Sequence, residues 1–145
     1  MSTIFTIGSS GKSAKSFFEM LRKNSISKLI DVRLHNTSHL AGYTKKNDLE
    51  YFLDKILSIK YIHMPILAPT DTILKDYKSG NISWKKYEND YIDLIKSRDI
   101  MSNLNGINFD NSCLLCSEKT PDNCHRRLAA EILKHNLNID KIIHL

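Results

Sequence analysis

The chain has 145 residues, which is enough for one domain with a hydrophobic core and too few for two comfortable ones. Hydrophobic residues make up 41% and charged residues 26%, which excludes an extensively disordered chain, and no apolar run approaches the length of a membrane span. The formal net charge of +5 favours an anionic small molecule or nucleic acid as a partner. Scattered lysines that only keep the protein soluble are the alternative explanation of that charge.

Short apolar runs alternate with longer amphipathic segments along most of the chain. Five strands are expected, at residues 3–7, 29–32, 61–63, 112–116 and 139–143. A helix capped by Ser13 follows the first strand. A second helix is expected to start at Asn47, with Glu50 in the position of a capping box, and a third begins at Cys124 behind the fourth strand.

The stretch between the third and fourth strands departs from this alternation. It predicts a short helix over residues 71–79 and a longer one capped by Ser83. Trp84, Tyr87 and Tyr91 recur on one face of the longer helix, where core packing is expected and stacking of bases is the alternative. The whole order predicts an α/β protein. Residues 1–145 are expected to form a single Rossmann-like domain, with a largely parallel sheet of about five strands, helices on both faces and a helical insertion between strands three and four.

Polar residues follow four of the predicted strands. At their ends or just beyond lie Gly8, Ser9 and Ser10 for the first strand, Asp31 and Arg33 for the second, His63 for the third, and Cys116, Glu118, Cys124, His125 and Arg126 for the fourth. In a parallel sheet the carboxyl ends of the strands share one edge, which is where α/β proteins bind their ligands. We therefore expect these side chains to surround one cavity.

The same residues carry a family resemblance. The segments at residues 6–10 (TIGSS), 31–33 (DVR), 63–65 (HMP), 115–118 (LCSE) and 124–126 (CHR) resemble, in this order, the domain of unknown function 488 family. The Cys-x-Glu and Cys-His-Arg motifs are its most specific part. The resemblance implies a compact α/β fold in a prokaryote and no assigned reaction. Many relatives have histidine where this chain has Ser9 and proline where it has Asn36, so no role of a histidine carries over to position 9.

Cys116 ends the fourth strand close to His125 and to the N-terminus of a helix, and both neighbours lower the pKa of a thiol. Cys116 is therefore a candidate nucleophile or redox centre, with His125 or His63 as the proton carrier. Glu118 and Asp31 would orient them. The alternatives are a buried, unreactive Cys116 and a structural His63.

Cys113 lies three residues before Cys116 in the same strand, so it is expected on the opposite face of the sheet, in the core. A metal ion held by Cys116, Cys124, His125 and His63 is a further alternative, and so is a disulfide between Cys116 and Cys124. No particular cofactor is indicated.

Arg33 and Arg126 are candidate anion-binding residues, because a guanidinium offers a planar fork of donors to phosphate or carboxylate. The alternative is an internal ion pair of each, with Asp31 and Glu118 respectively. The turn at residues 8–11 could cradle a phosphate with free N–H groups, although it fits no established phosphate-binding motif and a simple tight turn is the alternative.

Three cysteines leave at least one unpaired, and the first residues lack the segments of a secretory signal, so we expect a cytoplasmic protein with reduced thiols and no membrane association. The sequence favours a small enzyme, a cysteine-dependent hydrolase or transferase acting on an anionic, nucleotide- or nucleic-acid-related substrate. A non-catalytic nucleotide- or nucleic-acid-binding module and a metal-bound domain are the alternatives.

Overall fold

The computed structural model describes residues 2–37 and 42–145. Within them one sheet has five strands, all parallel, in the order β3-β2-β4-β1-β5. The strands are β1 (Thr3–Gly8), β2 (Lys28–Asp31), β3 (Lys60–His63), β4 (Ser112–Cys116) and β5 (Lys141–His144). The predicted α/β class and Rossmann-like parallel sheet are therefore confirmed.

Six α-helices connect and cover these strands in the described part of the chain. They are α1 (Ala14–Lys23), α2 (Lys46–Phe52), α3 (Asp71–Lys78), α4 (Trp84–Ser97), α5 (Ile100–Asn103) and α6 (His125–Leu137). Helices α3, α4 and α5 form the predicted insertion between β3 and β4. The side chains of Ser13 and Ser83 accept hydrogen bonds from main-chain N–H groups in the first turns of α1 and α4, as their positions in the sequence predict. No helix of the described residues is long and apolar enough to cross a membrane.

One local expectation is wrong, and one short helix was not predicted. Helix α2 begins at Lys46, so Asn47 lies inside its first turn, and its N-cap Lys45 makes no side-chain capping bond. The short helix α5 was not expected, because it starts from Asp99 in a left-handed conformation (φ 49°) that apolar periodicity does not signal.

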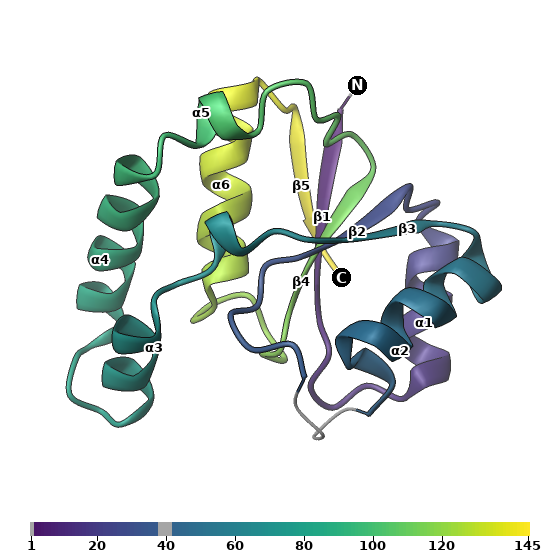
Figure 1. The fold of residues 1–145 in the computed structure, drawn as a ribbon, viewed down its shortest axis with the longest axis horizontal. Coiled ribbons are helices and arrows are strands. Elements are labelled where there is room, and N and C mark those ends of the chain that lie inside the picture. The colour runs from purple at the N-terminus through teal and green to yellow at the C-terminus, as the bar shows by residue number, and fades with distance from the viewer. Residues whose placement is uncertain (1, 38–41) are drawn as a thin grey trace.

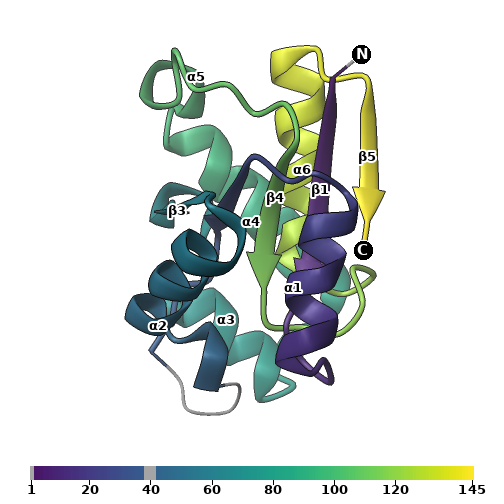
Figure 2. The same cartoon turned by 90° about the vertical axis from the view of Figure 1, so that its right-hand side faces the viewer.

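The sheet is the middle of three layers. Helices α1 and α2 cover one face, and α4 and α6 cover the other (Figures 1 and 2). Neighbouring residues in a strand point to opposite faces, so Ile4 packs on the α4–α6 side and Phe5 on the α1–α2 side. Cys113 belongs to the core on the α1–α2 side, whereas Cys116 contacts His125 of α6, which confirms the predicted separation of these two thiols.

The aromatic stripe of α4 is core, as expected. Tyr87 and Tyr91 are 1% and 0% exposed. The rings of Trp84 and Tyr87 stack with centroids 5.0 Å apart, and the ring of Tyr91 lies 5.8 Å from that of His125. Helix α4 therefore braces the first turn of α6, where the Cys-His-Arg motif lies.

Candidate functional site

A cavity of about 590 Å³ opens beyond the carboxyl end of β4. Its wall consists of residues 33–35 after β2, part of α3, Tyr87 of α4, residues 116–120 and residues 123–125. Five of the predicted site residues line it, namely Arg33, Cys116, Glu118, Cys124 and His125. The other six do not, so the polar residues after the four strands surround no single cavity.

The centre of this site is the contact between Cys116 and His125. The Sγ atom of Cys116 lies 3.7 Å from Nδ1 of His125, and Nε2 of the same ring lies 2.7 Å from the main-chain oxygen of Val32. A carbonyl oxygen only accepts hydrogen bonds, so Nε2 carries a proton and Nδ1 is left to face the sulfur. The imidazole is therefore oriented for proton exchange with the thiol.

Cys124 adds a second thiol to this pair. It is the N-cap of α6, and its Sγ accepts the main-chain N–H of Arg126 at 3.5 Å. The sulfur atoms of Cys116 and Cys124 and a ring nitrogen of His125 all lie within 4.8 Å of one another, and the three residues are buried. The carboxyl end of β4 and the first turn of α6 thus bring together one imidazole and two thiols.

The electrostatics of the cluster favour a charged Cys116. A hydrogen bond from the Cys124 thiol, together with the charge of His125, outweighs burial and holds the pKa of Cys116 well below its ordinary value. The pKa of Cys124 is raised by that same bond and by burial. Burial alone lowers the pKa of His125, but the nearby Cys116 charge outweighs it and raises that pKa.

Arg33 lines the cavity, but its guanidinium makes its hydrogen bonds to Asp31 and Thr44 in the protein interior. Its Nε and Nη2 atoms each lie 2.8 Å from a carboxylate oxygen of Asp31, which is 0% exposed. Tyr61 also donates its hydroxyl to Asp31, at 2.6 Å, and Nη2 of Arg33 reaches the main-chain oxygen of Thr44 at 2.7 Å. The internal ion pair is therefore present, and Asp31 is fully engaged by it rather than orienting Cys116.

Arg126 does not reach the cavity, contrary to expectation. It is 0% exposed, its Nε donates to Oγ1 of Thr6 at 3.3 Å, and its Nη1 donates to the main-chain oxygen of Glu118 at 2.6 Å. The alternative, an ion pair with the Glu118 carboxylate, is not found among the described residues, because Arg126 binds the main-chain carbonyl of Glu118 instead. Nη2 is buried without a partner among the described residues. Arg126 thus connects the segment after β4 to β1 through its hydrogen bonds to the Glu118 carbonyl and the Thr6 hydroxyl.

Two N–H groups of the turn after β1 are bonded within the protein. The N–H groups of Ser9 and Ser10 donate to the main-chain oxygens of Cys116 and Ser117, both at 3.0 Å. The tight-turn alternative is therefore favoured over a phosphate cradle. Glycine is required at position 8 because the main chain there passes close to the Glu118 oxygen. A Cβ atom at this position would lie 1.6 Å from that oxygen.

His63 is also separated from the cysteines. Its Nε2 donates to the main-chain oxygen of Arg33 at 3.0 Å, and it does not line the cavity. The structural alternative is thus favoured for His63. His63 lies at the same edge of the sheet as Cys116. However, β2 and the residues that follow it lie between β3 and β4 and separate the two side chains.

Tyr87 lines the cavity, although its helical spacing favoured core packing, with base stacking as the alternative. Its hydroxyl has no hydrogen-bond partner among the described residues, and the side chain lines the cavity. Burial, followed by the nearby charges of Cys116 and Cys124, raises its pKa, so the hydroxyl stays protonated and can donate. Helical spacing hid this role, because a residue that packs with its ring can still present its hydroxyl to a ligand.

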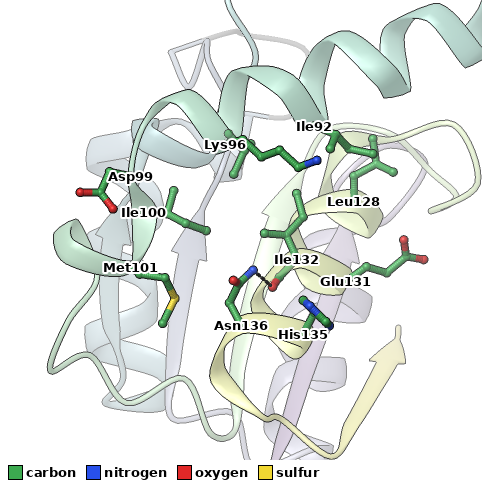
Figure 3. A pocket seen from close by; sticks show the side chains of 11 residues that line it. Ile92, Lys96, Asp99, Ile100, Met101, Leu128, Glu131, Ile132, His135 and Asn136 are labelled. Carbon is green, nitrogen blue, oxygen red and sulfur yellow. Dashed lines mark hydrogen bonds between the residues drawn. The ribbon is translucent and has the colours of Figure 1, made fainter.

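A second cavity, of about 550 Å³, lies between α4, α5 and α6 (Figure 3). Ile92, Ile100 and Ile132 form its apolar wall, and Lys96, Glu131 and His135 border it. It contains none of the predicted site residues and no thiol, so the candidate reaction site is the cavity at Cys116.

Fold and site together define an α/β protein with a cysteine–histidine centre at the carboxyl edge of a parallel sheet. Residues 13–133 match the family described as Domain of unknown function DUF488, and the chain belongs to this family. The matched segment includes β2, β4 and the Cys-His-Arg motif, which confirms the resemblance drawn from the motifs. Comparisons with curated proteins and with solved structures found no match.

Proposed function

We propose that this protein is a cytoplasmic enzyme, a cysteine-dependent hydrolase or transferase, that acts on an anionic substrate related to nucleotides or nucleic acid. The observation that carries the proposal is the contact of Cys116 with His125 at the floor of a cavity. The sulfur lies 3.7 Å from Nδ1, and the Val32 carbonyl fixes the other ring nitrogen as a donor. A nucleophile, a base and a group that orients the base are the parts of a nucleophilic catalytic site.

The reaction would run in two steps. The Cys116 sulfur bonds to the electrophilic atom of the substrate, while the bond from that atom to its leaving group breaks. The leaving group takes the electron pair and receives the proton that His125 took from the thiol. Water in a hydrolase, or an acceptor hydroxyl in a transferase, then displaces the sulfur and gives its proton to His125. Both steps balance without a redox partner.

The cavity walls support the substrate class. Lys78 and Lys119 line it and supply positive charge, and Arg33 lines it as well. Tyr77 and Tyr87 provide aromatic surface, with ring centroids 5.1 Å apart. Phosphate-bearing ligands bind to cations, and planar bases pack on aromatic rings. A nucleotide meets both requirements in a cavity of this size.

The first test is turnover by the metal-free protein with a panel of nucleoside phosphates and a short oligonucleotide. Release of a leaving group is expected, with a loss of at least about 10³-fold in Cys116→Ser. Cys113→Ala is the matched control, because its sulfur lies on the opposite face of the sheet, in the other core. It should keep the activity of the wild type.

The second test needs no substrate. Iodoacetamide at neutral pH should alkylate Cys116 much faster than Cys113, as read by peptide mass spectrometry. An unreactive Cys116 in folded, metal-free protein would contradict the nucleophile. Salt-dependent binding of nucleotide or nucleic acid without turnover would favour the non-catalytic binding module instead.

A further inference from the structure

We infer that Cys116, Cys124 and His125 form a three-ligand site for a single Zn²⁺ ion at the floor of the cavity. Zinc bound there would occupy the sulfur that the proposed reaction needs, so the inhibitory consequence, though not the binding, rests on the proposed function. The site is built by two neighbouring pieces of chain: the last residue of β4, and the N-cap and first residue of α6.

The distances fit zinc without a large movement. Zn–S and Zn–N bonds of about 2.3 and 2.0 Å in a tetrahedral site place sulfur and nitrogen about 3.5 Å apart. The Sγ of Cys116 and Nδ1 of His125 are 3.7 Å apart, and all three ligand atoms lie within 4.8 Å of one another. An ion at the centre of this triangle would therefore reach all three.

The orientation of His125 is that of a metal ligand. Histidines that bind metals commonly donate their second N–H to a carboxylate or a main-chain carbonyl, which fixes the ring and its tautomer. The Val32 oxygen, 2.7 Å from Nε2, holds this position, so the lone pair of Nδ1 is left to face the Cys116 sulfur. The ring contact with Tyr91 further restricts the imidazole.

The donor set selects the class of metal. Two thiolates and an imidazole suit zinc, whereas magnesium and calcium require oxygen ligands. Three protein ligands leave one position of a tetrahedral ion for water or a ligand, and the three residues all line the cavity from which it would come. Binding releases the thiol protons and blocks Cys116 as a nucleophile, so zinc would act as a reversible inhibitor.

The test uses full-length protein that has been stripped with a chelator. Zn²⁺ is titrated in competition with a chromophoric chelator, and Co²⁺ in a parallel titration reports thiolate ligation by its near-ultraviolet charge-transfer absorption. We expect one ion per chain, a cobalt–thiolate band, and protection of Cys116 from iodoacetamide in proportion to occupancy.

Variants assign the ligands. Cys124→Ala and His125→Ala should each weaken Zn²⁺ binding by at least about 10-fold, whereas the matched control Cys113→Ala should bind like the wild type. Circular dichroism checks that each variant folds, and the cobalt spectrum of the wild type tests the thiolate ligands without any substitution.

The inference is overturned if folded wild-type protein binds no Zn²⁺ at one ion per chain, if cobalt gives no thiolate band, or if Cys124→Ala binds as tightly as the wild type. Failure of the proposed function has a different signature. In that case zinc still binds, but the metal-free protein shows neither turnover nor preferential alkylation of Cys116.

Discussion

The ends of β2 and β4 lie side by side in the sheet, since the two strands pair directly, yet their polar residues behave differently. After β2, the Asp31 carboxylate accepts hydrogen bonds from Arg33 and Tyr61, so these three side chains bind one another. After β4, Cys116 and His125 contact each other and also line a cavity. The same edge of one sheet thus holds a polar network that stabilises the fold and reaches the cavity through Arg33 alone, and a cysteine–histidine cluster that remains accessible to a ligand.

The largest effect on stability is expected from opening the network after β2. Asp31→Ala leaves the guanidinium of Arg33 buried without its counter-charge, which should lower the free energy of unfolding by about 3–5 kcal/mol. Urea denaturation measures it. Asp71→Asn, which removes an exposed ion pair with Lys75, is the control and should leave the midpoint almost unchanged. Equal midpoints for both variants would contradict a stabilising role of the network after β2.

An intermediate effect is expected where the segment after β4 touches β1. In Gly8→Ala the new Cβ would lie 1.6 Å from the Glu118 oxygen and 2.4 Å from Nη1 of Arg126, so the loop must move. Overpacking of this kind typically lowers the free energy of unfolding by about 1–3 kcal/mol. Because that loop begins directly after Cys116, the alkylation rate of Cys116 should fall as well.

Gly42→Ala is the matched control, because nothing lies within 4 Å of the added carbon. It should change neither the urea midpoint nor the alkylation rate. If Gly8→Ala behaves in the same way, the close contact of Gly8 with the loop is not what holds Cys116 in place.

The smallest change in stability is expected from removing the hydroxyl group of one of two neighbouring tyrosines of α4. The Tyr91 hydroxyl donates to the Leu67 oxygen at 2.7 Å, so Tyr91→Phe should lower the free energy of unfolding by about 1 kcal/mol. The Tyr87 hydroxyl has no partner in the described residues, so Tyr87→Phe should leave stability unchanged but weaken ligand binding in the cavity. A destabilised Tyr87→Phe with unaltered binding would assign Tyr87 to the core alone.

Much of the architecture could be predicted from short-range patterns. Apolar periodicity located the strands, serine side chains marked the starts of α1 and α4, and the two-residue period of a strand separated Cys113 from Cys116. Asn47 failed as a helix start because a capping residue type is common at other positions of a first turn as well.

The cysteine–histidine centre was predictable because its residues are close in sequence. Cys116, Cys124 and His125 lie within ten positions, and one loop between β4 and α6 brings them together. To predict the positions of Arg126 and His63, one would need to know which way each side chain points and which main-chain oxygens lie nearby. Arg126 turns toward Thr6 and the Glu118 carbonyl, and no pattern in the sequence encodes that choice.

The aromatic stack of α4 has a practical consequence. Trp84 is the only tryptophan of the chain, and its ring contacts those of Tyr77 and Tyr87, both of which line the cavity at Cys116. Ligand binding in the cavity should therefore change the fluorescence emission of Trp84, because Tyr77 and Tyr87 contact both the indole and the cavity. The protein carries an intrinsic fluorophore beside its candidate site, so ligands can be screened by emission without attaching a dye.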